Sequence, residues 1–244
     1  MSLLDPSTTS LEQLLDYNRQ LATLSAQERV AWAFEHIPGN HALSTSFGIQ
    51  SAVSLHLATQ VRADIPVILI DTGYLFPETY RYADQLTEQL HLNLKVYRPD
   101  IGSAWMEARF GKLWENGGEG IARYNQLSKV EPMQRALEQL NVRCWHAGLR
   151  RNQASTRKNI AFLTLKDGRF KFHPIADWNE IDIGAYMLLH DLPEHPLAQK
   201  GYVSVGDVHT TRPLQPGMDI AQTRFFGLRR ECGLHFSEAS LPAA

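Results

Sequence analysis

The segment HALSTSFGIQSAVSLHLATQ, residues 41–60, joins a seven-residue strand pattern to a helix that we expect from Gln50 to Gln60. Two further strand-like runs follow, IPVILIDT at residues 65–72 and LNLKVYRP at residues 92–99. A helical stretch from Pro77 to His91 separates them. This alternation predicts an α/β fold, in which a parallel, twisted sheet is flanked by helices.

The rest of the chain extends this pattern on both sides. Amphipathic helices are expected at residues 10–24 and 26–36, the second with Ser25 as its N-cap. After the first three strands we expect another strand at residues 141–150, a hairpin that turns at Asp167-Gly168, and then a helix at residues 181–192.

The domain boundary is predicted where the regular pattern ends. Residues 1–203 are expected to form one α/β domain, of which residues 1–40 are a helical preface. Beyond Val203 the sequence becomes rich in Thr, Pro and Gly. Residues 204–244 are therefore expected to form a flexible C-terminal tail.

The composition excludes several classes of protein. A hydrophobic content of 43% and a charged content of 20% are ordinary for a globular protein, and the net charge of −2 favours neither nucleic acid nor a membrane surface as a partner. Two cysteines cannot build a disulfide framework. No signal peptide pattern and no membrane-length apolar run is visible. We expect a cytoplasmic protein that binds a small molecule.

Two loops at strand ends carry candidate ligand contacts. STSFGIQS, residues 44–51, offers several hydroxyls and Gly48 before a helix, which is typical of an anion cradle. The alternative is that its Ser and Thr side chains only cap the helix. DTGYLFPETYRY places Asp71 and Thr72 at the ligand edge of the sheet, although it can also be an ordinary turn. Together the loops favour a phosphorylated ligand.

Several arginines stand at separate points of the chain: Arg150, Arg151, Arg212, Arg224, Arg229 and Arg230. Guanidinium groups bind phosphate and sulfate oxygens in pairs of hydrogen bonds. Any one of these arginines can be a solvated surface charge. As a set, they suit a ligand with more than one anionic group.

Cys232 is the candidate nucleophile. It lies in RRECGLH, residues 229–235, where neighbouring cations favour the thiolate form. A zinc site built on Cys232 and His235 lacks ligands, because the only other cysteine is Cys144. Cys144 lies in an apolar strand pattern and is expected to be an inert buried thiol.

The motifs STSFGIQS, DTGYLFPETYRY, KVEPMQRAL, GLRR, VGDVHTTRP and RFFGLRRECGLH resemble, in this order, those of the phosphoadenylylsulfate (PAPS) reductase family. The resemblance implies an adenine nucleotide α-hydrolase-like (PP-loop) fold for the nucleotide-binding domain, and a homodimer. It further implies that Cys232 attacks the sulfur of PAPS to form a Cys-S-sulfonate. Reduced thioredoxin or glutaredoxin then releases sulfite, in assimilatory sulfate reduction and cysteine biosynthesis.

The resemblance also implies roles for individual residues. His235 accompanies Cys232 at the catalytic position. The candidate substrate-binding residues are Ser44, Ser46, Gly48, Ser51, Asp71, Thr72, Lys129, Arg150, Arg151, Arg212 and Arg224.

At two motifs this sequence differs from related families, and each difference disfavours one of their activities. The pyrophosphatase version of the first loop has Asp and Gly where this chain has Gln50 and Phe47, which disfavours cleavage of ATP. Adenylylsulfate (APS) reductases hold an iron–sulfur cluster at four cysteines, whose positions here read Tyr124, Asn125, Asp207 and Thr210. We therefore expect no iron–sulfur cluster, no metal and no other bound cofactor.

Three alternatives to a PAPS reductase stay open at this point. A cluster-free APS reductase would use the same thiol chemistry on a nucleotide without the 3′-phosphate. An ATP-using adenylyl transferase is suggested by the first loop and the fold. A nucleotide sensor without catalysis would have no use for an activated cysteine.

Overall fold

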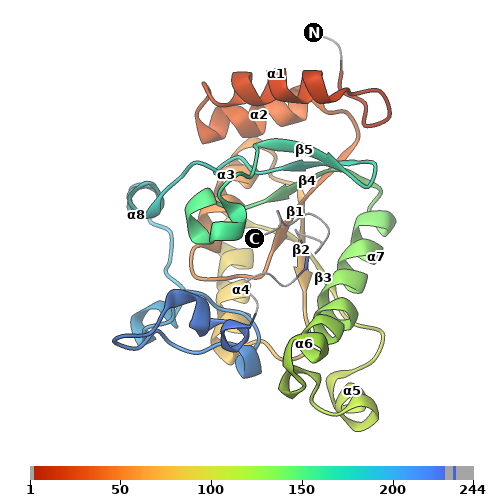
Figure 1. Cartoon of the computed structure of the whole chain (residues 1–244). Helices are drawn as coiled ribbons and strands as arrows, with labels where there is room; N and C mark the ends of the chain where they lie inside the picture. The colour runs from red at the N-terminus through yellow and green to blue at the C-terminus, as the bar shows by residue number, and fades with distance from the viewer. Residues whose placement is uncertain (1–2, 229–232, 235–244) are drawn as a thin grey trace.

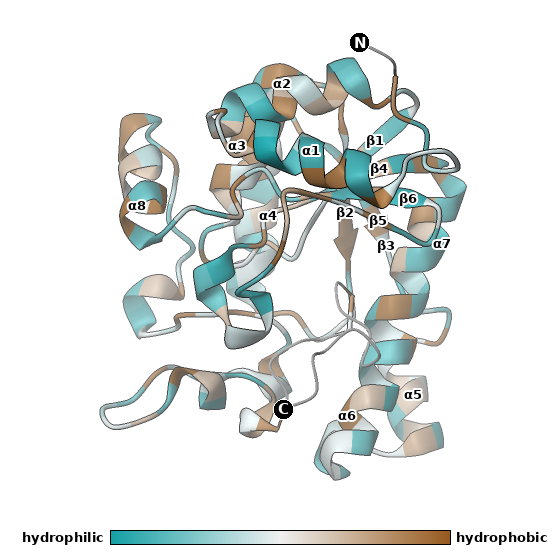
Figure 2. Cartoon of the chain, turned by 45° about the horizontal axis from the view of Figure 1, so that its top comes forward, coloured by the Kyte–Doolittle hydropathy of each residue, from teal (hydrophilic) through white to brown (hydrophobic). Residues whose placement is uncertain are grey.

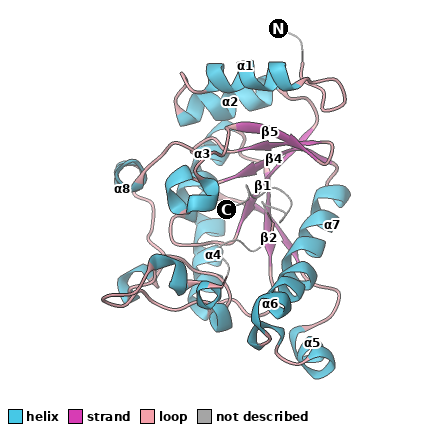
Figure 3. Ribbon diagram, viewed as in Figure 1, coloured by secondary structure: helices cyan, strands magenta, loops and turns pink. Residues whose placement is uncertain are grey.

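The computed structural model describes residues 3–228 together with Gly233 and Leu234. Within them, six strands form one sheet in the order β3-β2-β1-β4-β6-β5, and all neighbouring pairs are parallel except β5 with β6. The strands are β1 Asn40–Thr45, β2 Pro66–Ile70, β3 Asn93–Tyr97, β4 Val142–Ala147, β5 Leu163–Lys166 and β6 Arg169–Phe172. The predicted α/β fold with a parallel sheet is confirmed (Figure 3).

The helices lie on both sides of this sheet (Figure 1). They are α1 Leu11–Leu21, α2 Ala26–His36, α3 Ser51–Val61, α4 Pro77–Leu90, α5 Ser103–Phe110, α6 Gly117–Asn125, α7 Glu131–Gln139 and α8 Glu180–Leu189. A π-helical turn, Gln126–Val130, connects α6 to α7. Among the described residues, none of the helices is long and apolar enough to cross a membrane.

Successive residues of a strand point to opposite sides of the sheet, and both sides of the central strand β1 are buried. Leu43 packs in a cluster with Leu55 of α3 and Tyr82 of α4. Its neighbour Ala42 packs in another cluster with Met133 of α7. The sheet is thus the middle layer of three, and only its edges and strand ends remain open to a ligand.

The first two helices pack on the sheet. The predicted N-cap at Ser25 is confirmed, because Ser25 and Glu28 form a capping box. The helices pack on β4 and β6, and hydrophilic and hydrophobic residues alternate along them (Figure 2). Arg29 of α2 is buried and forms an ion pair with Asp177 at 2.6 Å.

The hairpin of β5 and β6 turns as its sequence predicts. Asp167 and Gly168 both have positive φ, of 52° and 70°. This is the conformation that a tight two-residue turn with an Asp-Gly sequence adopts.

The predicted boundary at residue 203 is wrong. Val205, Asp207, Thr223 and Phe225 are buried, and Asp207 forms a β-bridge with Leu75. Residues 204–225 therefore pack on the domain as part of it. The segment was expected to be flexible because its many Thr, Pro and Gly residues form no periodic pattern. Its own buried side chains pack against the rest of the domain and hold it in place.

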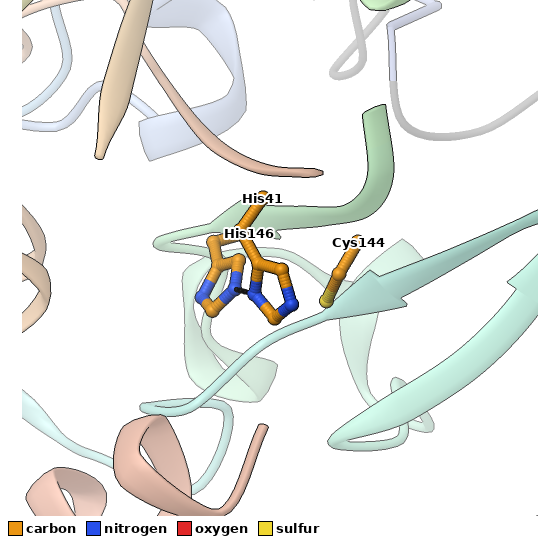
Figure 4. A group of neighbouring side chains, drawn as sticks. All are labelled: His41, Cys144 and His146. Carbon is orange, nitrogen blue, oxygen red and sulfur yellow. Dashed lines mark hydrogen bonds between the residues drawn. The ribbon is translucent and has the colours of Figure 1, made fainter. Parts of the chain in front are cut away.

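The buried side chains of Cys144, His41 and His146 lie together on two neighbouring strands, β1 and β4 (Figure 4). His41 Nδ1 lies 2.9 Å from His146 Nε2, and His41 Nε2 lies 2.8 Å from the carbonyl oxygen of Ile37. Both nitrogens of His41 therefore lie at hydrogen-bonding distance from a partner, whereas His146 Nδ1 has no partner within residues 3–228 and 233–234. Cys144 is buried as expected, and burial raises the pKa of its thiol.

We predict that acid destabilises the fold through its buried histidines. Burial lowers the pKa of His41 and His146, and it lowers the pKa of His173 to about 4. The unfolded side chains take up a proton near pH 6.5, so stability is complete above that pH and falls below it. The free energy of unfolding should drop by up to about 1.4 kcal/mol per pH unit for each histidine. Urea titrations between about pH 7.5 and 5 measure it, and a constant value would contradict the prediction.

We also predict that two glycines of α6 respond differently to alanine. A Cβ at Gly120 would lie 2.1 Å from the carbonyl oxygen of Leu113, whereas a Cβ at Gly118 meets nothing within 4 Å. Gly120→Ala should lower the free energy of unfolding by about 1–3 kcal/mol. Gly118→Ala should leave it unchanged or raise it by up to about 1 kcal/mol. Urea denaturation compares the two variants, and equal effects would show that the backbone contact is unimportant.

Candidate active site

The carboxyl ends of β1, β2 and β4 surround a pocket of about 280 Å³. The chain leaves β1 toward β2, while β4 lies on the other side of β1. Such a reversal of strand order is where open α/β sheets bind ligands. Eight of the predicted substrate-binding residues line this pocket: Ser44, Ser46, Gly48, Ser51, Thr72, Lys129, Arg150 and Arg224.

The loop after β1 is folded by its own hydroxyls and by β4. The indole Nε1 of Trp145 donates to Ser44 Oγ at 2.7 Å, and the backbone N–H of Phe47 donates to Thr45 Oγ1 at 2.9 Å. Phe47 is buried with a φ of 47°. Helix α3 then begins at Ser51 without a side-chain cap, so the alternative that these residues serve to cap the helix is wrong.

Lys129 and Asp207 form a buried ion pair in the pocket wall. Lys129 Nζ lies 2.5 Å from Asp207 Oδ2, and Thr72 Oγ1 donates to Asp207 Oδ1 at 2.6 Å. Burial alone would raise the pKa of Asp207. The ammonium of Lys129 and the two hydrogen bonds outweigh it and lower that pKa to about 2. Asp207 is therefore ionised at neutral pH.

Aromatic rings enclose this ion pair. Lys129 Nζ lies 5.5 Å from the ring centroid of Tyr124 and 5.2 Å from that of Phe225. Close by, the ring of His209 stacks on Trp114 at 3.6 Å, and burial lowers the pKa of His209 to about 4. These rings exclude water from the pair, which strengthens its electrostatic interaction.

Arg150 and Arg224 reach the pocket from different segments of the chain. Arg150 follows β4 and is buried. Arg224 Nη1 donates to Ser204 Oγ at 3.0 Å and to the carbonyl oxygen of Val205 at 3.1 Å. Gly206 makes this position possible, because a Cβ there would lie 2.2 Å from Arg224 Nη2.

Three predicted substrate-binding residues lie outside the pocket wall. Asp71 accepts hydrogen bonds from Tyr80 Oη at 2.6 Å and from Arg98 Nε at 2.8 Å, which hold the turn after β2. Arg151 Nε donates to the carbonyl oxygen of Ile160, and the exposed Arg212 donates to that of Gln222. The structure thus gives each of the three a partner within the protein.

The two predicted catalytic residues, Cys232 and His235, lie outside the described residues. The two residues between them are described. Leu234 lines the pocket, and Gly233 lies against Val130, where a Cβ would be 3.5 Å from Val130 Cγ2.

Sequence reasoning missed Asp207, Gln153 and Arg157, which also line the pocket. Asp207 belongs to a quoted motif, and its lone carboxylate among Gly, Val and Thr was a usable signal. Gln153 and Arg157 lie in two short 3₁₀ turns after β4, where Arg157 Nη1 donates to Gln153 Oε1 at 2.7 Å. Nothing in their local sequence distinguishes them from surface residues.

Comparison with known proteins finds relatives over most of the chain. A model of the phosphoadenosine phosphosulfate reductase domain matches residues 40–213. Phosphoadenosine 5′-phosphosulfate reductase of Vibrio cholerae is 59% identical over 91% of this chain and 88% of its own length. That of Shewanella oneidensis is 59% identical over 95% and 94%.

Solved structures show the same likeness. A phosphoadenylyl-sulfate reductase from Candida auris matches with a TM-score of 0.74 and 28% identity, over 84% of this chain and 98% of that one. FMN adenylyltransferase of Candida glabrata matches with a TM-score of 0.57 at 14% identity, over 84% and 69%, which shows the fold alone. The predicted adenine nucleotide α-hydrolase-like fold is confirmed. The chain is an enzyme and belongs to the phosphoadenosine phosphosulfate reductase family.

Proposed function

We propose that this enzyme reduces PAPS to sulfite and adenosine 3′,5′-bisphosphate, with Cys232 as its nucleophile. The observation that carries the proposal is that Leu234, two residues after Cys232, lines a cationic pocket at the ligand edge of the sheet. The names of the relatives, which are PAPS reductases, support the choice of substrate.

The charge of the pocket fits a nucleotide with several anionic groups. Among its described lining residues, Lys129, Arg150, Arg157 and Arg224 stand against the single carboxylate of Asp207. The surplus of positive charge lies in a partly enclosed space, where it is screened less than on an open surface. PAPS carries a sulfate and two phosphates, whereas APS lacks the 3′-phosphate.

The proposed first step is an attack of the Cys232 thiolate on the sulfur of the sulfate group. A bond forms between the two sulfur atoms, and the bond from sulfur to the bridging oxygen breaks. Its electron pair leaves on the phosphate oxygen of adenosine 3′,5′-bisphosphate. Lys129 and Arg224 lie in the pocket wall, where they can stabilise this negative charge.

The proposed second step needs a dithiol donor, for which we propose thioredoxin or glutaredoxin. A donor thiolate attacks the Cys232 sulfur, and sulfite leaves with the electron pair of the sulfur–sulfur bond. The second donor thiol resolves the mixed disulfide, so the donor is oxidised and Cys232 returns to its thiol. We propose no bound cofactor or metal, and we assign the enzyme to cytoplasmic assimilatory sulfate reduction as a homodimer.

We predict that Cys232→Ser abolishes sulfite formation while nucleotide binding persists. A serine hydroxyl is not ionised at neutral pH and cannot accept the sulfonate. Intact mass after addition of PAPS without a donor should show one added sulfonate on the wild type and none on the variant. Cys144→Ser, at the buried thiol, is the matched control and should still form the adduct. Sulfite production by Cys232→Ser would refute the mechanism.

We predict that Lys129→Met impairs both stability and activity, and that a second substitution separates the two effects. The single variant leaves the buried Asp207 carboxylate without its ion-pair partner, which should cost about 3–5 kcal/mol. Lys129→Met combined with Asp207→Asn removes both charges and should recover most of that stability. The rate of sulfite formation should stay reduced by about 10-fold to 100-fold because the cation is lost. Recovery of activity in the double variant would show that Lys129 is only structural.

A further inference from the structure

Arg150, Gln50 and Glu180 form a closed set of hydrogen bonds at one end of the pocket. Arg150 Nη2 donates to Gln50 Oε1 and, at 3.0 Å, to Glu180 Oε1. Gln50 Nε2 donates to Glu180 Oε2 at 2.5 Å. Gln50 is the N-cap of α3 and Glu180 is the first residue of α8. This set, which we name the Arg150 brace, ties two helices to the segment after β4.

The brace holds one nitrogen of the guanidinium group and leaves another unsatisfied. Arg150 is only 1% exposed and lines the pocket. Its Nη1 is buried and has no hydrogen-bond partner within residues 3–228 and 233–234. An unsatisfied charged donor in a pocket wall is costly until a ligand supplies an acceptor. Phosphate oxygens are the acceptors that a guanidinium group binds best.

The Arg150 brace and the Lys129–Asp207 pair lie at different strand ends. Thr72, the partner of Asp207, follows β2, whereas Arg150 follows β4, and β1 lies between these strands. Neighbouring strands are about 4.8 Å apart, so the ends of β2 and β4, beside which the two cations lie, are separated by about 10 Å. Such a separation suits two anionic groups of one nucleotide better than two contacts to the same phosphate.

Gly233 and Leu234, the two described residues after Cys232, meet the pocket on the Lys129 side. Leu234 packs in the cluster of Ile70, at the end of β2, and Met133 of α7. Gly233 lies against Val130, the neighbour of Lys129. If Cys232 attacks the sulfate, as in the proposed function on which this step rests, the sulfate binds on this side. The lining cations left for the other anionic end are Arg150 and Arg157, which both follow β4, and of these Arg150 is the buried one.

We propose that Gln50 and Glu180 position Arg150 as the binding group for the 3′-phosphate of the nucleotide. Glu180 is thereby a positioning residue for the choice between PAPS and APS. Its side chain is 65% exposed, so solvent screens its charge. Its effect on a bound phosphate is therefore exerted through the orientation of the guanidinium group.

The test compares adenosine 3′,5′-bisphosphate with adenosine 5′-monophosphate by calorimetry on the full chain. The ratio of the two dissociation constants reports the 3′-phosphate alone. Arg150→Gln should weaken binding of the bisphosphate by about 10-fold to 100-fold and binding of the monophosphate by less than about 3-fold. Arg150→Lys keeps the positive charge but loses the paired N–H donors of the guanidinium group. It should retain part of the preference for the bisphosphate over the monophosphate.

Glu180→Gln should reduce the preference for the bisphosphate by about 3-fold to 10-fold. Asp182→Asn is the matched control. It removes a carboxylate from the same helix end, where Asp182 bonds to the backbone N–H of Asn179 and not to Arg150. Its ratio of dissociation constants should equal that of the wild type. Thermal unfolding checks that each variant is folded.

Two results would overturn the proposal. If Arg150→Gln weakens both nucleotides equally, Arg150 binds the 5′-phosphate that they share. If Glu180→Gln leaves the ratio unchanged, the brace does not position Arg150. Neither measurement needs sulfite formation, so a chain that binds the bisphosphate through Arg150 but makes no sulfite would refute only the proposed function.

Discussion

The buried ion pair of Lys129 and Asp207 is the interaction on which the pocket depends. It joins three parts of the chain: the π-helical turn between α6 and α7, the end of β2 through Thr72, and the segment 204–225. Buried charges are stabilising only when each is paired and its remaining hydrogen-bonding capacity is used. Here Thr72 supplies the second bond to the carboxylate, so the pair can hold a segment that has little regular structure of its own.

Local periodicity predicted the strands and the helices between them, because a buried parallel sheet requires short apolar runs at regular intervals. It did not predict α5, α6 or α7. Gly117, Gly118 and Gly120 indicate a turn, yet they belong to α6. This helix is stabilised from outside, since Ile121 and Tyr124 pack with Trp114 and Phe225 in one cluster. Phe225 is distant in sequence, and no local pattern can show such a contact.

The residues of the site also divide into those that the local sequence pattern predicts and those that only tertiary contacts bring to the pocket. Ser44 lies at the end of β1, and Thr72 and Arg150 follow β2 and β4. The topology of a parallel sheet brings residues at such positions to one edge. Asp71 and Arg151 follow the same strands but turn toward partners in the protein. Of two neighbouring residues after a strand, one enters the pocket and the other does not. The local sequence does not show which of the two it is. Asp207 and Arg157 reach the pocket through tertiary packing alone.

The place of Leu234 couples the two halves of the proposed reaction. Leu234 packs against the cluster of Ile70 and Met133 and lines the pocket, so the residue two positions after the proposed nucleophile forms part of the proposed binding surface. In the proposed reaction a protein donor attacks the sulfur of Cys232, two residues before Leu234. Breaking the contact to admit the donor also removes a wall of the pocket, which weakens the hold on the nucleotide. We therefore expect release of the bisphosphate and access of the donor to be favoured by the same movement in the proposed reaction.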